Sequence, residues 1–210
     1  MAAPHPWLKP GVIAGACIPG AVIVARAATG HLGANPIAES LNRFGLCALI
    51  FLVASLACSP VKMLTGWTWP VRIRRNVGVI AFAYASVHLL TYVGVDQGFA
   101  WGTLFKDVLK RPFIAVGFLA WLGMLPLAIT STDAMVKRLG FVKWKQLHRV
   151  AYVAGVLGAI HFYMRVKSDV REPLVYASVV GTLLVLRVVD AIRHPKPKPK
   201  PRAAPRPEPG

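Results

Sequence analysis

Six runs of apolar residues, each about as long as a membrane span, alternate with polar or charged segments along the sequence. The runs cover residues 11–28, 44–63, 77–95, 112–131, 147–165 and 173–190. A helix of ~20 apolar residues crosses the ~30 Å hydrocarbon core of a bilayer, so each run predicts one transmembrane helix. The pattern therefore predicts an all-α fold, a six-helix transmembrane bundle over 11–190. A short N-terminus (1–10) precedes it, and a basic, proline-rich tail (191–210) that we expect to be disordered follows it.

Composition agrees with a membrane protein, and the distribution of charge predicts its orientation. Hydrophobic residues make up 55% of the 210 residues, and the mean hydropathy is +0.53. Of the 25 lysines and arginines, 17 fall on the N-terminus, the 62–76 and 132–149 loops, and the segment from Arg187 to the end of the tail. By the positive-inside rule both termini are cytoplasmic. The net charge of +17 then reflects topology and contact with anionic lipid, and nucleic-acid binding is not expected.

Two histidines lie inside the third and fifth runs in similar surroundings. His88 belongs to GVIAFAYASVHLLTY and His161 to AYVAGVLGAIHFYMR. Small residues precede each histidine by ten, seven and three positions: Gly78, Ala81 and Ala85 on one helix, and Ala151, Ala154 and Gly158 on the other. These offsets fall close to one helix face, so each helix offers a shallow channel with an imidazole near one end. The pattern favours a haem with His88 and His161 as axial ligands of the iron.

Simpler explanations of these features stay open at the level of sequence. Small residues in membrane helices commonly serve close helix packing, and an intramembrane histidine can hydrogen-bond a neighbouring helix. The three cysteines show neither CxxC nor CxxCH spacing, so any haem is expected to be of the non-covalent b type. Arg165, one turn beyond His161, can meet haem propionates or simply reach toward the membrane surface.

A second set of candidates lies toward the predicted cytoplasmic surface. Arg74 precedes His88 by 14 residues, which places it on the same helix face about 21 Å away. A guanidinium does not ligate iron, but Arg74 or the adjacent Arg75 can pair with a propionate or a flavin phosphate. His148 precedes His161 by 13 residues, so in a straight helix the two side chains point about 140° apart. Two roles for His148 therefore stay open: a cofactor contact or iron ligand, and an ordinary interfacial residue.

Five stretches, in order along the chain, resemble the MsrQ family, formerly YedZ, which belongs with the ferric reductase-like transmembrane domains. They are FGLCALIFLVASLACSP, RRNVGVIAFAYASVHLLTY, KRPFIAVGFLAW followed by PLAITST, RLGFVKWKQLHRVAYVAGVLGAIHFYMRVK, and PLVYA. The resemblance implies a multi-pass protein of the bacterial inner membrane with one or two haem b groups, and with FMN or quinone as further cofactors. His88, His148 and His161 match the three family histidines. Arg74 or Arg75 stands where oxidase relatives carry a fourth, which argues against a complete second bis-histidine haem.

The same resemblance implies an electron-transfer subunit. Electrons would pass from a cytoplasmic flavin reductase or from quinol to periplasmic MsrP, a molybdopterin enzyme that reduces methionine sulfoxide in periplasmic proteins. The chain carries no glycine-rich nucleotide fingerprint, no candidate molybdenum site and no reactive-cysteine motif, so it is not expected to reduce methionine sulfoxide itself. Two alternatives are a stand-alone transmembrane reductase of metal ions or oxygen, and a haem-free transporter or assembly factor.

Overall fold

The computed structural model describes residues 6–194, and every regular element in that range is helical. The long helices are α1 (Leu8–Ala28), α2 (Pro36–Thr65), α3 (Trp69–Leu90), α5 (Pro112–Ile129), α8 (Val150–Arg165) and α9 (Arg171–Arg193). The shorter elements are the π-helical segment η1 (Thr91–Asp96), which continues α3, and the helices α4 (Trp101–Lys110), α6 (Asp133–Leu139) and α7 (Phe141–Leu147). The predicted all-α class is therefore confirmed. Most of the predicted tail lies outside the described residues.

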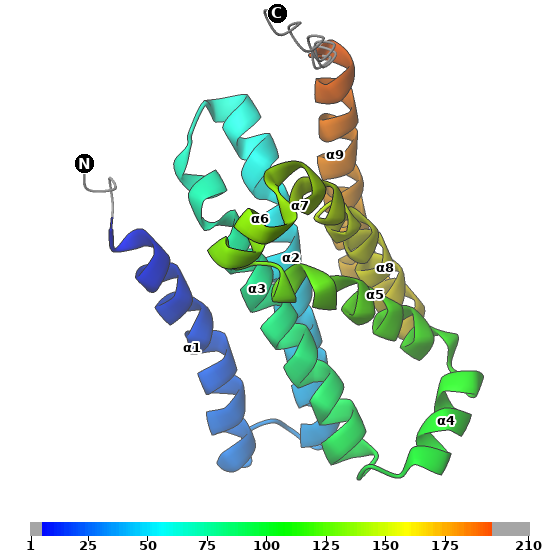
Figure 1. Ribbon diagram of the computed structural model, residues 1–210. Helices are drawn as coiled ribbons and strands as arrows, with labels where there is room; N and C mark the ends of the chain where they lie inside the picture. Colours follow the sequence, from blue (N-terminus) through cyan, green and yellow to red (C-terminus); the bar gives the residue numbers. More distant parts are fainter. Residues whose placement is uncertain (1–5, 195–210) are drawn as a thin grey trace, which may run out of the picture.

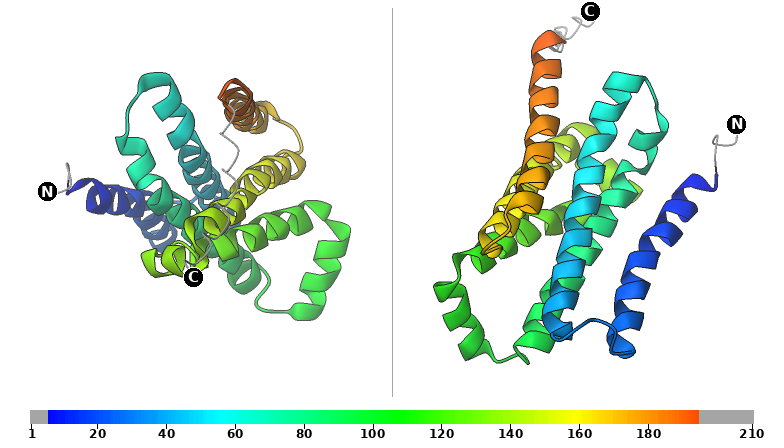
Figure 2. Two further views of the ribbon diagram at one scale, coloured as in Figure 1. Left: turned by 45° about the horizontal axis from the view of Figure 1, so that its top comes forward. Right: turned by 180° about the vertical axis from the view of Figure 1, so that it is seen from behind.

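The long helices lie side by side, and successive connections alternate between the two ends of the bundle (Figure 1). The start of α1, the α2–α3 turn, α6, α7 and the end of α9 lie at one end, here called the α6–α7 end. The other connections, including α4, lie at the opposite end, here called the α4 end (Figure 2). α2 packs chiefly against α3 and α5 chiefly against α8, while α1 lies outermost against α3 and α2. The bundle is therefore built from two helix pairs, with the candidate site between them.

Five helical segments of the described residues are long and apolar enough to cross a membrane, which indicates a multi-pass membrane protein. The predicted span at 147–165 does not reach this length, because α7 ends at Leu147 and a turn precedes α8. The 16 residues of α8 extend about 24 Å at a helical rise of about 1.5 Å per residue, less than the ~30 Å hydrocarbon core. The six-span count and the cytoplasmic position of both termini stay predictions.

Tyr84 of α3 repairs an interruption that Pro19 makes in α1. Proline distorts a helix because its ring crowds the preceding turn and it has no N–H to donate. The Tyr84 hydroxyl accepts a hydrogen bond from the Gly20 N–H at 2.8 Å and donates one to the Ala16 carbonyl at 2.6 Å. These two backbone groups would bond to each other in a regular helix. One hydroxyl therefore satisfies both groups and fastens α1 to α3.

We expect Tyr84→Phe to destabilise the protein, because it removes the only side-chain partner of two backbone groups inside the bundle. An unsatisfied buried group costs about 1–3 kcal/mol. Thermal unfolding of the purified protein in detergent should show a lower midpoint than for the wild type. Tyr163→Phe is the matched control, since the Tyr163 side chain is about half exposed on α8. Equal midpoints for the two variants would contradict the assigned role of the Tyr84 hydroxyl.

Candidate functional site

A cavity of about 370 Å³ lies between the two helix pairs, and both His88 and His161 line it. Its size falls in the range of ~300–1,000 Å³ that is common for cofactor and ligand sites. Three of the six predicted small residues, Ala85, Ala154 and Gly158, line this cavity, and Gly78 and Ala151 line a smaller one nearer the α6–α7 end. Five of the six small residues therefore border a cavity, whereas Ala81 is packed in the core.

The imidazole rings of His88 and His161 face each other across the larger cavity. Their centroids are 6.1 Å apart, and their planes are inclined by 79°. A metal–imidazole bond is about 2 Å long and the ring centroid lies about 1 Å behind the nitrogen, so two rings ligating one ion from opposite sides have centroids about 6 Å apart. The observed separation therefore fits a single metal ion held between the two rings.

A backbone carbonyl of a neighbouring helix holds each of these rings. The Nδ1 atom of His88 lies 2.9 Å from the Leu41 carbonyl oxygen on α2, and that of His161 lies 2.7 Å from the Phe113 carbonyl oxygen on α5. A carbonyl oxygen only accepts hydrogen bonds, so Nδ1 carries the proton in each ring and Nε2 keeps its lone pair. Metal-bound histidines typically use their second nitrogen in this way, which fixes the tautomer and the ring orientation. Both rings are therefore arranged to donate Nε2 to a metal.

A glycine lies against each ring, four residues after the carbonyl that holds it. A Cβ atom on Gly117 would come within 2.6 Å of Nδ1 of His161, and one on Gly45 within 3.1 Å of Nδ1 of His88. The first distance is too short for any Cβ contact and the second is tighter than most, so the close approach of each ring to its neighbouring helix is favoured by the missing side chain. Gly45 and Gly117 were not predicted as site residues, because no pattern within a single helix shows which residue of a neighbouring helix it will contact.

The two histidines in the cavity suit a metal ion whose other ligands come from a cofactor rather than from the protein. Within residues 6–194 no group of three or more His, Cys, Asp and Glu side chains lies close enough to hold a metal ion. The two histidines therefore supply at most two nitrogens, one from each of two neighbouring rings. A haem iron requires only such a pair from the protein, because its macrocycle supplies the remaining donors. The paired rings and the largely apolar cavity thus fit the predicted haem.

Two arginines line this cavity where it approaches the α4 end. Arg165 donates a hydrogen bond to the Asn42 side-chain oxygen at 2.5 Å, and Arg111 pairs with Asp107 at 3.0 Å. Guanidinium groups bind carboxylates well, so Arg165, whose partner is neutral, is placed to pair with an acidic group on a ligand, and Arg111 can do so beside Asp107. The sequence analysis singled out Arg165 by its spacing from a histidine but missed Arg111, which lies between two helices and has no such spacing.

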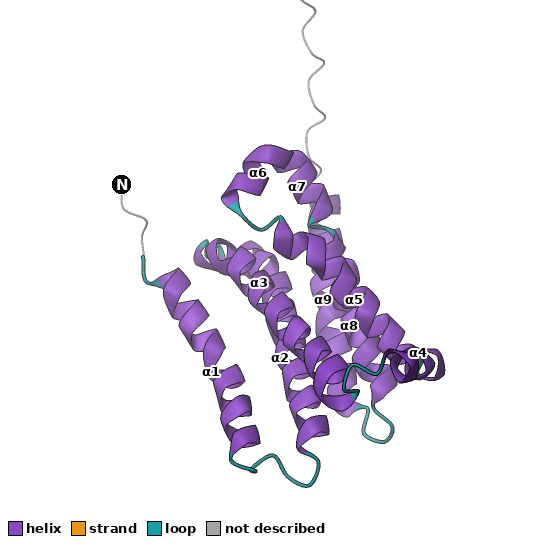
Figure 3. Ribbon diagram, turned by 60° about the horizontal axis from the view of Figure 1, so that its bottom comes forward, coloured by secondary structure: helices purple, strands orange, loops and turns teal. Residues whose placement is uncertain are grey.

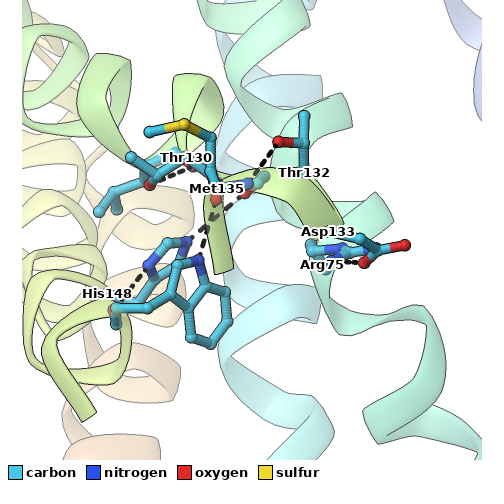
Figure 4. A network of polar contacts seen from close by, with 9 residues as sticks. Arg75, Thr130, Thr132, Asp133, Met135 and His148 are labelled. Carbon is cyan, nitrogen blue, oxygen red and sulfur yellow. Dashed lines mark hydrogen bonds and ion pairs between the residues drawn. The ribbon is translucent and has the colours of Figure 1, made fainter. Parts of the chain in front are cut away.

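The structure places Arg74, Arg75 and His148 around the smaller cavity, whose volume is about 70 Å³. Arg74 donates to the Ser59 hydroxyl at 2.9 Å, and Arg75 pairs with Asp133 at 2.5 Å (Figure 4). The hydrogen bond from Arg75 holds the pKa of the exposed Asp133 carboxyl below its ordinary value. Arg75 is thus already paired with a carboxylate, whereas Arg74 has a neutral partner.

His148 lies in the turn between α7 and α8. The angle of about 140° that a straight helix would set between His148 and His161 therefore does not apply. Its Nδ1 atom lies 3.0 Å from the Trp144 carbonyl oxygen, and its ring stacks on the Trp144 indole with centroids 3.9 Å apart (Figure 4). As in the other two histidines, the carbonyl places the proton on Nδ1, and Nε2 keeps its lone pair and lies 3.5 Å from the Ser131 hydroxyl oxygen. Among the described residues, however, no second histidine lines this cavity.

Arg187 of α9 also lines the smaller cavity, and the sequence analysis missed its role there. Pro60 has no N–H to donate to the Leu56 carbonyl of α2, and a guanidinium nitrogen of Arg187 donates to that oxygen at 2.7 Å. Arg187 also donates to the Tyr152 hydroxyl of α8. Its Nε atom is the one buried side-chain nitrogen or oxygen in the described part of the chain that has no hydrogen-bond partner. Arg187 therefore joins three helices at the cavity wall.

Comparisons with known proteins agree with this architecture. Residues 16–159 match the family described as ferric reductase like transmembrane component. Several bacterial proteins named protein-methionine-sulfoxide reductase heme-binding subunit MsrQ are similar to the chain. The relative from Rhodospirillum rubrum is 50% identical, over 80% of this chain and 81% of its own length. The relative from Deinococcus radiodurans is 42% identical, over 92% and 96%, and that from Caulobacter vibrioides is 44% identical, over 80% of each chain.

Proposed function

The chain belongs to the MsrQ family of ferric reductase-like transmembrane proteins, and from this premise we propose that it is the haem-binding membrane subunit of a methionine sulfoxide reductase system. In this proposal His88 and His161 would hold a haem b by binding its iron, and Arg111 and Arg165 would pair with its propionates. One observation carries the assignment: two opposed imidazoles, each held through Nδ1 by a carbonyl of a neighbouring helix, face one apolar cavity. When bound there, haem supplies one-electron transfer.

The residues of the chain bind and orient this group and shield it from water. The Leu41 and Phe113 carbonyls keep both imidazoles in the tautomer that presents Nε2 to the iron. Trp121, which lines the cavity, is fixed by a hydrogen bond of 2.9 Å from its indole N–H to the Ser86 hydroxyl. Apolar walls lower the local dielectric, and together with ligand orientation they set the reduction potential.

We propose that electrons enter at the α6–α7 end and leave at the α4 end of an inner-membrane protein. The excess of lysine and arginine at the α6–α7 end supports a cytoplasmic location for it, so the larger cavity would lie in the periplasmic half of the membrane. The proposed donor is a cytoplasmic flavin reductase or quinol. The proposed acceptor is periplasmic MsrP, the molybdopterin enzyme that repairs oxidised periplasmic proteins, so this chain itself needs no methionine sulfoxide site.

The smaller cavity is the proposed contact with the donor side. Its volume of about 70 Å³, against about 370 Å³ for the larger cavity, favours a single haem per chain over two. Arg74 and, in exchange for Asp133, Arg75 suit an anionic group such as the phosphate of FMN, and the Nε2 lone pair of His148 suits a hydrogen bond donated by a quinol hydroxyl or a flavin N–H. His148 is thus proposed as a cofactor contact, and its use as a second iron ligand would need a partner from elsewhere.

The test uses purified full-length protein in detergent or lipid. We expect a reduced-minus-oxidised spectrum of the b type and a single haem per chain. We also expect the reduced protein to be oxidised rapidly only when MsrP and methionine sulfoxide are both present. Well-folded protein without haem would contradict the proposal and favour a transporter or assembly factor. Equal oxidation by ferric chelates or oxygen, with no response to MsrP, would instead favour a stand-alone transmembrane reductase.

A further inference from the structure

α4 separates apolar from polar side chains more sharply than the spanning helices do. Trp101, Phe105 and Leu109 follow one another at four-residue spacing and form a stripe along the helix, whereas Lys106 and Lys110 point to another side. The three stripe residues are 69%, 68% and 71% exposed. No described part of the chain therefore covers this stripe, although its side chains are among the largest apolar ones.

Asp107 fixes which side of α4 faces the bundle. It accepts a hydrogen bond of 2.8 Å from the Tyr92 hydroxyl of η1 and pairs with Arg111 at 3.0 Å, and its side chain is only 15% exposed. At about 100° per residue, Asp107 projects roughly 160° away from Phe105. The contacts of Asp107 therefore turn the stripe away from the protein, so its exposure follows from the orientation of the whole helix.

The connections of α4 keep it at the membrane boundary. η1 ends at Asp96, a short loop leads to Trp101, and α5 begins at Pro112, directly after the end of α4. Figure 3 shows α4 on the flank of the bundle, beside the start of α5. Both neighbouring elements belong to candidate spans. Because α4 is tied to two spans at the same end, its uncovered side lies within reach of the lipid that surrounds them.

We propose that α4 is an interfacial helix whose stripe of Trp101, Phe105 and Leu109 is immersed in the lipid leaflet at the α4 end of the bundle. Amphipathic helices with aromatic residues on one side and lysines on another bind bilayer surfaces in this manner. Lipid is the favoured occupant because α5, which continues directly from α4, is itself a candidate span and also exposes large apolar residues on the outside of the bundle. Through Asp107, the lipid-bound helix holds Tyr92 and Arg111, both of which line the larger cavity.

Spin labels on adjacent residues of α4 test this proposal in the full-length protein. Phe105→Cys and Lys106→Cys are labelled separately with a nitroxide, and the protein is placed in phospholipid nanodiscs. Both variants need a cysteine-free background, in which alanine replaces Cys17, Cys47 and Cys58. Collisions with oxygen, which concentrates in lipid, are compared with collisions with a water-soluble nickel chelate. We expect the oxygen-to-nickel ratio to be severalfold higher at residue 105 than at residue 106.

Labels at Trp101 and Lys110 should repeat this difference, with residue 101 behaving like 105 and residue 110 like 106. Ready access of the nickel chelate to residue 105 would overturn the proposal, because the stripe would then lie in water. Poor access of both reagents to residue 105 would also overturn it, since protein would then cover the stripe. In that case distances between labels on two chains show whether the covering protein is a second copy.

Discussion

Replacing either His88 or His161 with alanine is expected to remove the haem from the purified protein. Each substitution deletes one of the two facing imidazoles, and no other histidine of the described residues lines the cavity. Loss of a group that only orients a metal ligand already costs about 10–100-fold in affinity, so loss of the ligand itself should cost more. The haem-to-chain ratio, measured together with the reduced-minus-oxidised spectrum, reports this change directly.

Two other histidines serve as controls for this experiment. His31 lies in the α1–α2 connection, where its Nδ1 atom is 2.9 Å from the Thr29 hydroxyl, and His31→Ala should leave the spectrum unchanged. His148→Ala should also keep the spectrum while slowing electron entry from the donor, because this residue lines the smaller cavity. A b-type spectrum that survives in both His88→Ala and His161→Ala would show that the iron site lies elsewhere.

Gly117→Ala is expected to disturb the same site without touching a ligand. The new Cβ atom would lie 2.6 Å from Nδ1 of His161, so the ring must shift, which weakens its hydrogen bond to the Phe113 carbonyl. We expect a lower haem-to-chain ratio and a weaker low-spin signal by electron paramagnetic resonance. Gly45→Ala should act in the same direction but less strongly, because its Cβ atom would lie 3.1 Å from His88.

A third glycine provides a control that separates the contact with the histidine ring from the general effect of alanine on helix stability. Gly181 lies in α9 with no other atom within 4 Å of a Cβ placed on it. Alanine is favoured over glycine in a helix interior by about 1 kcal/mol, so Gly181→Ala should leave both stability and spectrum intact or improve stability. A wild-type spectrum in Gly117→Ala would mean that the carbonyl contact does not hold the ring in the membrane.

Helix positions were largely predictable from the sequence, because length and hydropathy are local properties. The last predicted run at 173–190 corresponds to α9 (Arg171–Arg193), and the run at 112–131 to α5 (Pro112–Ile129). The break before α8 was not predictable in this way, since neither proline nor glycine marks it. It coincides with a tertiary contact, in which the Trp144 indole donates a hydrogen bond of 2.9 Å to the Thr130 carbonyl at the end of α5.

The candidate site could be predicted only in part, for a similar reason. The opposed histidines share a pattern of small residues that is visible in each helix alone, and the structure brings their rings together. Gly45, Gly117 and Arg187 act on groups of other helices, so their roles become visible only once the packing is known. The sequence shows which residues can do chemistry, whereas the helix contacts decide which of them are held in place.

The two carbonyl contacts have a consequence for the order in which the protein can be assembled during synthesis. His88 of α3 is held by α2, and His161 of α8 is held by α5, so each ring is oriented within its own helix pair. The first pair is complete before α5 has been translated, and it already presents one oriented imidazole. The second imidazole is oriented only after α8, which is short for a span, has packed against α5. Capture of a cofactor between the two rings can therefore occur only in a nearly complete chain, which makes it a natural checkpoint of biogenesis.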